Sequence, residues 1–529
     1  MKTAAALANA AWLARNLAAA RRFARALDDP RGMQAEWLRR ALAQHAASEV
    51  GRTLDFAAIG SADEFARRVP LTDHDSAVAP VIERIRRGEP CVLSADRVTH
   101  VVPTSGSTGA RKLIPFTAGL QRGFDEAIGA WTVDLARRRP GITGGPAYWS
   151  ISPLAEADRP TAAPGAVPIG VADDASYLGG TSAWLVRQVL AVPESLARVA
   201  DARAFWRLTA LALLRQPELR LISIWHPTFL ECLVEAAADA WPELLDAVAC
   251  GECPWASAVP VGARALWRAA PDPRRAAALR GIGRDRWPGW WPALQVVSCW
   301  GDQAAEPGWR RLARMLPAVL VQAKGLLATE AVVTIPWGGH TPVAVTSHYF
   351  EFLDEQGEVR GAHQLQRGER YEVVVTNGGG LWRYRLGDIV ECTGHVRETP
   401  SLRFLGRAGR VSDLRGEKLS EVFVASVVRA LWPAGDAPVF AALRACDSGR
   451  EAHYELLVDE ASMPDAAGSL ADRLDAALHA NPHYALARRL GQLLPPRIVG
   501  ANAAQRREEL AAGRARIGDV KPNALILSR

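Results

Sequence analysis

The chain has 529 residues, of which 49% are hydrophobic and 23% are charged, and its formal net charge is +6 at pH 7. This length exceeds a single core, so we expect at least two structural units of an ordinary globular protein. The basic residues are mostly scattered arginines without an aromatic-basic RNA motif, and no apolar run reaches about 18 residues, so neither a nucleic-acid partner nor a membrane span is expected.

Helices are predicted over residues 5–50, with a break at Asp28-Asp29-Pro30. The alanine-rich start is similar to a short signal sequence, but the arginines from Arg15 to Arg25 continue the same helical pattern, which favours an amphipathic first helix. Seven scattered cysteines form no disulfide framework and are typical of a reducing compartment, so a cytoplasmic location is expected. The pair Cys250 and Cys253 lacks a second pair of zinc ligands at suitable spacing.

The most informative segment follows a predicted strand at 99–103. It comprises Thr104, Ser105, Gly106, Ser107, Thr108, Gly109, Ala110, Arg111 and Lys112. Glycines let backbone N–H groups approach an anion closely, and the hydroxyls and the lysine add further donors. The segment therefore predicts a polyphosphate-binding loop. It is not a Walker loop, because its lysine does not directly follow the second glycine and runs into Leu-Ile-Pro.

The remainder of the large N-terminal unit predicts an α/β fold, with β-sheets flanked by helices and a β-rich subdomain. Residues 140–182 are rich in Gly, Pro and Ala and are expected to be irregular. The elements expected after them are helices over 183–250 with a buried strand at 221–225, parallel strands at 294–299 and 319–323 around a helix at 304–316, and a strand-rich stretch at 341–393 with turns at 354–357 and 377–378.

The pattern changes after Arg407, where a small α+β unit is predicted. A polar, glycine-containing stretch at 407–416 is the expected hinge. We therefore divide the chain into a large domain at 1–408 and a small domain at 409–529. The elements expected in the small domain are helices at 419–432, 468–480 and 484–491 and strands at 438–445 and 452–458.

Lysine is rare in this chain, which makes its positions informative. Only five lysines occur, and four of them lie in segments of interest, namely Lys112, Lys324, Lys418 and Lys521. A compact ammonium group is not interchangeable with a planar guanidinium group, so these positions are candidates for a specific need for lysine.

Four segments, in this order, resemble the adenylate-forming enzymes (acyl-CoA synthetases, luciferases and adenylation domains). They are the loop at 104–112, Lys-Gly-Leu-Leu-Ala-Thr-Glu at 324–330, Gly-Leu-Trp-Arg-Tyr-Arg-Leu-Gly-Asp at 380–388 and Phe-Leu-Gly-Arg at 404–407. Lys-Leu-Ile-Pro after the loop, Tyr-Phe-Glu-Phe at 349–352 and Tyr-Glu-Val-Val-Val-Thr at 371–376 are similar to the acyl-acid amido synthetases of the auxin-responsive Gretchen Hagen family. The likeness covers most of the chain.

This resemblance implies ATP and Mg²⁺ as cofactors. It implies that the loop, from Thr104 to Gly109, and Lys112 grip the β- and γ-phosphates, that Thr329 contacts the α-phosphate, and that Glu330 binds Mg²⁺. Asp388 and Arg407 would hold the ribose. The large domain at 1–408 would be the adenylation domain, and the small domain at 409–529 would be a mobile lid. Lys521 would come from this lid domain and reach the carboxylate and the α-phosphate during adenylation.

One departure from the family pattern concerns the adenine. A tyrosine that stacks on the base usually stands four residues before the glutamate, and Leu326 stands there in this chain. The acyl pocket has weaker signals, because the histidines and tryptophans in segments that could line it are more often core residues. The candidates are Trp225, His226, Trp300, His340 and His348.

We therefore expect an ATP-dependent, AMP-forming ligase that activates a small carboxylic acid as an acyl-adenylate and joins it to an amine, which is an amino acid or an amine metabolite. Thioester formation on coenzyme A or a carrier protein is one alternative. A catalytically silent nucleotide-binding protein is another, against which intact Lys112, Glu330, Asp388 and Lys521 count. The expected partners are these small molecules only, for a monomer or weak dimer.

Overall fold

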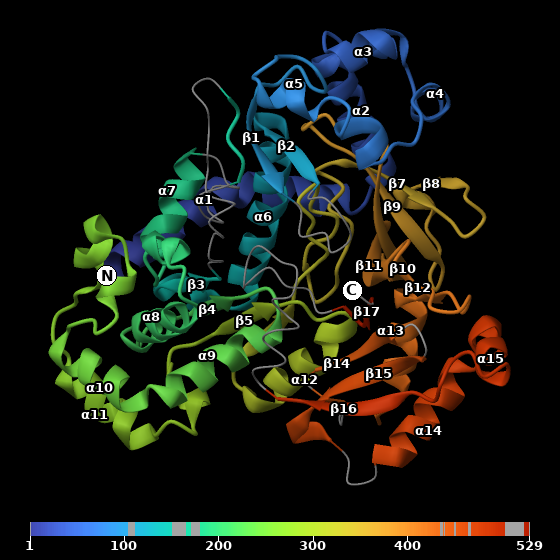
Figure 1. The fold of residues 1–529 in the computed structure, drawn as a ribbon. Helices are drawn as coiled ribbons and strands as arrows, with labels where there is room; N and C mark the ends of the chain where they lie inside the picture. Colours follow the sequence, from blue (N-terminus) through green and yellow to red (C-terminus); the bar gives the residue numbers. More distant parts are fainter. Residues whose placement is uncertain are drawn as a thin grey trace.

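A computed structural model describes residues 2–103, 112–150, 166–170, 180–433, 437–438, 440–448, 451–463, 467–502 and 523–527. The fold combines a large α/β unit with C-terminal elements that gather on one side of it, as Figure 1 shows in orange and red. None of the helices in these ranges has the length and apolar character of a membrane span.

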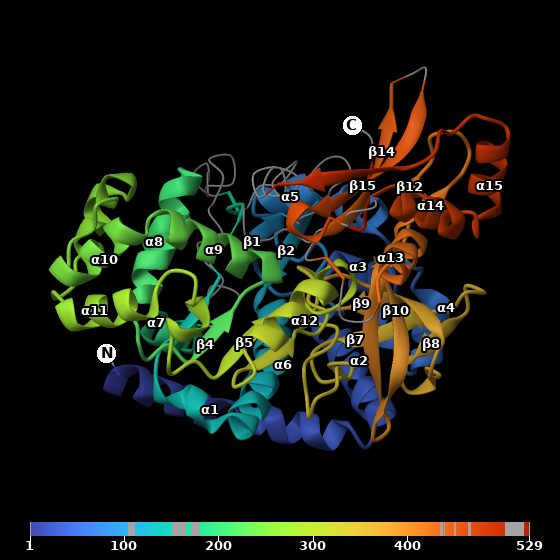
Figure 2. The ribbon, with the colours of Figure 1, turned by 90° about the horizontal axis from the view of Figure 1, so that it is seen from below.

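The N-terminal helices confirm the expected break. Helix α1 (Lys2–Ala26) ends just before the Asp28-Asp29-Pro30 sequence, and α2 (Pro30–His45) begins at the proline. The Asp29 carboxylate accepts a hydrogen bond from the Gly32 N–H at 2.8 Å, so it caps the new helix. Helix α1 buries Trp12, Ala19 and Phe23 and exposes its arginines, and it runs beneath the large unit in Figure 2.

A four-stranded parallel sheet lies at the centre of the large unit, in the order β3-β4-β5-β6. Helix α1 and two further helices cover one face of this sheet, and five described helices cover the other face. The strands are β3 (Ala147–Trp149), β4 (Leu221–Ser223), β5 (Val296–Cys299) and β6 (Leu320–Ala323). The helices on the face of α1 are α6 (Ala118–Arg138) and α7 (Gly180–Val189), and those opposite are α8 (Ala202–Leu214), α9 (Pro227–Asp239), α10 (Trp241–Cys250), α11 (Pro273–Ile282) and α12 (Glu306–Met315). The parallel pairing of β5 and β6 around α12 confirms the expected crossover.

The predicted phosphate loop connects an antiparallel pair. Strand β1 (Val98–Pro103) ends opposite the start of β2 (Leu113–Thr117), with Pro103 in register with Leu113. The Thr117 hydroxyl then accepts the Leu120 N–H at 3.2 Å and caps α6. Three short helices precede this pair, namely α3 (Glu49–Thr53), α4 (Ala62–Arg68) and α5 (Ile82–Arg86).

A five-stranded antiparallel sheet forms the β-rich subdomain, in the order β11-β10-β9-β7-β8. Its strands share a core with β1, β2 and α6, which includes Phe116, Phe124, Phe350 and Phe352. The strands are β7 (Tyr349–Leu353), β8 (Val359–Gly361), β9 (Arg370–Thr376), β10 (Tyr384–Val396) and β11 (Thr399–Arg407).

The C-terminal elements have a hydrophobic cluster of their own, which includes Val424, Leu443, Tyr454 and Leu474. They match the expected α+β pattern, while the domain boundary at residue 408 stays a prediction. The elements are β12 (Val411–Ser412), β13 (Leu419–Ser420), α13 (Glu421–Ala430), β14 (Ala441–Asp447), β15 (Ala452–Asp459), α14 (Ala467–Leu478), α15 (Pro482–Arg489), β16 (Arg497–Ala501) and β17 (Leu525–Ile526).

A buried arginine ties the N-terminal helices to the antiparallel sheet. Arg383 has a φ of 48°, and its Nε lies 3.1 and 2.9 Å from the two carboxylate oxygens of Glu351. Its Nη1 donates to the Ala66 and Val69 carbonyls at 2.6 and 2.7 Å, at the end of α4. Both charged side chains are only 4% exposed. Removal of one partner of such a pair leaves the other charge buried and uncompensated.

We therefore expect Arg383→Leu to lower the stability of the large unit by about 3–5 kcal/mol. The urea concentration at half-unfolding, followed by tryptophan fluorescence, measures this change. Arg360→Leu, which removes a pair with Asp354 at the surface, is the control and should shift the midpoint little. Equal small shifts for both variants would contradict the assigned role of Arg383.

Candidate functional site

A bulge in β10 positions the central carboxylate of the site. Pairing with β9 jumps from Arg385 opposite Val374 to Ile389 opposite Glu372, so extra residues accumulate on β10 between these two pairs. Gly387 adopts a φ of 73°, and its carbonyl accepts the Ala408 N–H at 2.6 Å. A bulge of this kind re-aims the side chain that follows it, which is Asp388. Asp388 thus lies within β10, directly after the bulge.

Asp388 forms a buried ion pair with Arg407. The two residues are in register across β10 and β11, and Arg407 Nε donates to Asp388 Oδ1 at 3.0 Å. Asp388 is fully buried, whereas the Arg407 side chain keeps 43% of its surface exposed. The second oxygen, Oδ2, has no hydrogen-bond partner among the residues that the structure describes. A buried carboxylate oxygen without a donor is costly, so this oxygen can accept a hydrogen bond from a ligand.

Glu330 is the second buried carboxylate of the site. Its backbone carbonyl accepts the Asn377 side-chain amide at 2.7 Å, which fixes the 324–330 segment against the β9–β10 turn. Burial raises the pKa of Glu330 above its ordinary value, Arg407 and Lys112 act to lower it, and Asp388 adds to the rise. Asp388 and Glu330 together raise the pKa of Arg407. Four expected site residues therefore lie within electrostatic reach of one another.

The other residues expected to bind the nucleotide are more exposed or lie outside the described residues. Lys112 is exposed at the start of β2, where the next N–H, that of Leu113, donates to His74 Nε2 at 3.3 Å. Thr329 is half-buried beside Glu330. Thr104, Ser105, Gly106, Ser107, Thr108, Gly109 and Lys521 lie outside the described residues, so their roles stay predictions.

Three of the five candidates for the acyl pocket come together at the carboxyl ends of β4, β5 and β6. The Trp225 and Trp300 rings are 5.5 Å apart, and the Lys324 ammonium lies 4.8 Å from the centre of the Trp225 ring. Lys324 Nζ also donates to Ser223 Oγ at 2.8 Å. His226, Trp300 and Lys324 line a pocket, and its other walls are formed by Gly301, Asp302, Gln303, Ala305, Gly325, Leu326, Leu327 and Phe404.

Two further features of this pocket concern its walls. Leu326 lines it at the position where the tyrosine was expected, so an aliphatic side chain replaces the aromatic one. Burial raises the pKa of Asp302 to about 6, although its carboxylate accepts the Phe404 N–H at 3.1 Å. This hydrogen bond links the loop after β5 to β11.

The other two histidine candidates lie elsewhere. His340 is exposed in a turn closed by hydrogen bonds with Trp337. His348 is fully buried with its ring against Trp37, Phe124 and Phe350, and burial lowers its pKa to about 3. His348 is therefore a neutral core residue, which is the more common role of a histidine in such a segment.

Sequence reasoning missed the residues that hold the site in place. Asn377 bonds to Glu330, and His74 accepts a hydrogen bond from Leu113. The members of each pair are far apart in sequence, so no local sequence signal predicts these contacts. Asn377 appeared in the sequence only as a turn residue. Asp302 carried no motif, and its burial alone gives it an altered pKa.

Comparisons with known proteins agree with this arrangement. Sequence profiles of the GH3 family N-terminal domain and the GH3 family central domain match residues 19–320 and 341–407. A rice protein named probable indole-3-acetic acid-amido synthetase GH3.12 is 27% identical, over 88% of this chain and 86% of its own length. The mouse GH3 domain-containing protein is 30% identical over 43% of this chain and 47% of its own length.

Solved structures extend the likeness to the fold. AtGH3.15 acyl acid amido synthetase in complex with 2,4-DB has a TM-score of 0.82 at 18% identity, with 97% of this chain and 94% of that chain covered. A 2-hydroxyisobutyryl-CoA ligase in the postadenylation state has a TM-score of 0.50 at 12% identity, with 97% and 90% covered. The fold is therefore that of the adenylate-forming enzymes.

The electrostatics of Glu330 generate a stability prediction. Because burial raises its folded pKa, the ionised carboxylate destabilises the protein once the pH rises through that pKa, and no such cost exists at a pH below its ordinary pKa. We expect Glu330→Gln to raise the melting temperature at pH 7.5, on the order of 1–3 °C, and to leave it unchanged near pH 4.

Differential scanning calorimetry at both pH values measures this effect, with the exposed-turn variant Glu355→Gln as control. The control should show no pH-dependent gain. A lower melting temperature for Glu330→Gln at pH 7.5 would mean that the surrounding cations stabilise the carboxylate and would contradict the account.

Proposed function

This chain belongs to the GH3 family, and from that premise we infer that it is an ATP-dependent, AMP-forming ligase. It activates a small carboxylic acid as an acyl-adenylate and transfers the acyl group to an amine, so that an amide forms. The observation that carries this proposal is the buried Asp388–Arg407 pair beside Glu330 and Lys112, within the segments that the family shares. The rice and Arabidopsis relatives are named indole-3-acetic acid-amido synthetases, and a Nicotiana attenuata relative is named a jasmonoyl-L-amino acid synthetase.

Asp388 and Arg407 would hold the ribose of ATP. Asp388 Oδ2 is buried and finds no donor within the described part of the chain, so two ribose hydroxyls supply the missing hydrogen bonds. Arg407 pairs with the Asp388 carboxylate, and its side chain keeps 43% of its surface exposed, so a ligand can reach it. Hydrogen bonds to a charged acceptor in a buried site are among the stronger ones, so this contact anchors the nucleotide.

The cationic side chains would bind the phosphates of ATP. Lys112 and the loop from Thr104 to Gly109 are assigned to the β- and γ-phosphates, and Thr329 to the α-phosphate. Glu330 fits a Mg²⁺ ion, because it is a buried carboxylate whose pKa is raised by burial and whose charge a divalent cation would compensate. When bound, Mg²⁺ would neutralise the charge that the phosphate oxygens carry.

The chemistry requires charge neutralisation at each step. In the first step a carboxylate oxygen bonds to the α-phosphorus, and the bond to the bridging oxygen breaks, so pyrophosphate leaves. Both reactants are anions, and Lys521 would reduce their repulsion. In the second step the amine nitrogen attacks the carbonyl carbon, the bond to the AMP oxygen breaks, and the amine loses a proton to solvent.

The small domain at 409–529 is proposed to act as a lid. Lys521 belongs to it, so closure would deliver this side chain to the reacting groups and exclude water from a hydrolysable acyl-adenylate. Rotation of the lid would then admit the amine. The proposed enzyme acts as a monomer or weak dimer. We place it in the cytoplasm because its few, scattered cysteines are typical of a reducing compartment.

Thioester formation is the second candidate, because a CoA ligase shares the fold. Replacement of the amine by coenzyme A in an assay of the released AMP separates the two: turnover with an amine supports the amido synthetase. A silent nucleotide-binding protein would bind ATP without any acid-dependent reaction.

Acid-dependent exchange between ATP and labelled pyrophosphate tests the adenylation step. With a panel of aryl and short aliphatic acids, we expect exchange for at least one acid. Asp388→Asn and Lys521→Ala should each reduce it about 10²–10³-fold, because each removes a charged contact in the transition state. Lys521→Arg keeps the charge but not the compact ammonium, so it should restore little.

The control is Glu355→Gln, which changes an exposed residue in the turn after β7. It should retain most of the exchange rate. Undiminished exchange in Asp388→Asn would contradict the assigned ribose contact. Binding of ATP without exchange for any acid would support the silent-binder alternative.

A further inference from the structure

The inner face of the parallel sheet, beneath α6, carries a row of polar side chains. Trp149, Ser223, Ser298 and Gln322 are in register across β3, β4, β5 and β6. Since alternate residues of a strand point to opposite faces, these four share one face. Residues on the opposite face, such as Ile222, Val297 and Val321, pack in the core with α8 and α9. We call Ser223, Ser298 and Gln322 the polar row.

Two hydrogen bonds confirm where the polar row points. Lys324 is two residues beyond Gln322 on the same face, and its ammonium donates to Ser223 Oγ at 2.8 Å. Trp131 of α6 donates its indole N–H to Gln322 Oε1 at 2.8 Å. The row therefore lies between the sheet and α6, directly below the carboxyl ends where Trp225, Trp300 and Lys324 meet.

The polar row is buried and has unused donors. Ser298 is fully buried and Gln322 is 6% exposed. Ser298 Oγ and Gln322 Nε2 find no hydrogen-bond partner anywhere in the described ranges, and the same holds for the Trp225 indole N–H above them. A buried polar atom without a partner is rare in a native fold, and several on one face indicate that a ligand or water completes them. The amide and indole nitrogens can only donate, so the missing group is an acceptor.

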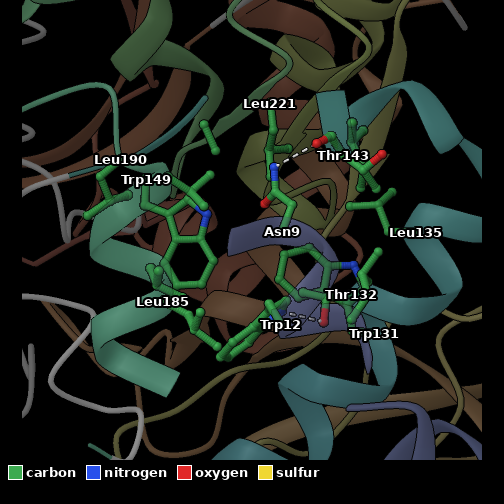
Figure 3. A pocket seen from close by; sticks show the side chains of 15 residues that line it. Asn9, Trp12, Trp131, Thr132, Leu135, Thr143, Trp149, Leu185, Leu190 and Leu221 are labelled. Atoms are coloured by element: carbon green, nitrogen blue, oxygen red, sulfur yellow. Dashed lines mark hydrogen bonds between the residues drawn. The ribbon is translucent and has the colours of Figure 1, made fainter. Parts of the chain in front are cut away.

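An apolar pocket adjoins the row on its other side. It lies between α1, α6, α7 and β3, and Figure 3 shows Trp12, Trp131, Trp149 and Leu221 among its walls. Trp131 and Trp149 belong to both the pocket and the surroundings of the row. Two of its polar side chains are satisfied, because Asn9 donates to two backbone carbonyls and Trp12 donates to Thr132. The described residues that line this pocket are mostly aromatic and aliphatic, whereas unpaired donors lie on the polar row.

This inference rests on the proposed function and names the class of acid. We propose that Ser298 and Gln322 select a carboxylic acid that bears a second hydrogen-bond-accepting group, a hydroxyl or another carboxylate, over an acid of the same shape without one. The acid enters at the carboxyl ends of the strands with its reacting carboxylate toward the nucleotide. Its flat or apolar body packs against Trp225 and Trp300, and its second polar group reaches the row.

A selective site of this kind penalises the wrong substrate. A hydrocarbon acid would leave the buried donors unpaired, and sites built to bond a hydroxyl reject analogues without it far more strongly than apolar pockets reject an extra methylene. We expect a ratio of at least about tenfold in kcat/KM between paired acids in the wild type.

The test uses shape-matched acids in pyrophosphate exchange: 4-hydroxybenzoate against 4-methylbenzoate, and 6-hydroxyhexanoate and adipate against heptanoate. Ser298→Ala and Gln322→Leu should reduce the ratio several-fold without a change in the KM for ATP. Ser298→Ala should also leave the melting temperature unchanged or higher, because it removes a hydroxyl that has no partner in the described fold.

The matched control is Ser195→Ala. Ser195 is also buried, but its hydroxyl accepts the Trp267 indole N–H at 3.0 Å, on the opposite face of the sheet. This variant should lower the melting temperature and leave the ratio between paired acids unchanged. A melting temperature lowered equally in Ser298→Ala, with an unchanged ratio, would assign the row a structural role and overturn the proposal.

Calorimetric titration of the same acids, without ATP, separates this inference from the proposed function. Exchange with no preference between paired acids overturns the inference and leaves the ligase assignment intact. Selective binding that is lost in Ser298→Ala, without exchange, supports the row and contradicts the ligase assignment. Neither exchange nor selective binding overturns both.

Discussion

The site depends on one constraint: Asp388 is a fully buried carboxylate that Arg407 holds by one oxygen, and its other oxygen has no donor among the described residues. Burial makes the unsatisfied oxygen costly in the absence of a ligand and selective in its presence. The bulge at Gly387 and the register between β10 and β11 bring Asp388 and Arg407 together, because a regular strand would point the side chain of residue 388 in another direction. Glu330 and Lys112 lie within electrostatic reach of this pair, and the proposed nucleotide site is built on these four side chains.

The fold supports this cluster with contacts that carry no chemistry of their own. Asn377 holds the segment of Glu330, and Arg383 ties the antiparallel sheet to the N-terminal helices. The parallel sheet contributes in another way, because its carboxyl ends bring Trp225, Trp300 and Lys324 together from three strands. Buried charges at Glu330 and Asp302 oppose folding at neutral pH, and the apolar cores on both faces of the sheet offset that cost.

Much of the fold followed from local signals. The break at Pro30, the strand before the loop, and the β5–α12–β6 crossover each had a proline, a glycine-rich loop or an apolar run to mark them, whereas β2 after the loop was not predicted. The motif residues Glu330, Asp388 and Arg407 were found because short segments resemble a family. The polar row could not be found in this way, because Ser223, Ser298 and Gln322 are far apart in sequence and become neighbours only through strand register. His340 and His348 lie apart from Trp225 and Trp300 for the same reason: their place in the fold could not be read from the local sequence.

The most direct test of the central claim follows the oxygen atoms. The acid that supports exchange is labelled with ¹⁸O in both carboxylate oxygens and incubated with ATP, Mg²⁺ and an amine, and the nucleotide product is analysed by mass spectrometry. An acyl-adenylate requires that one labelled oxygen remains on the phosphorus, so the account predicts AMP that carries one ¹⁸O. Unlabelled AMP, or ADP with labelled phosphate, would contradict activation at the α-phosphorus.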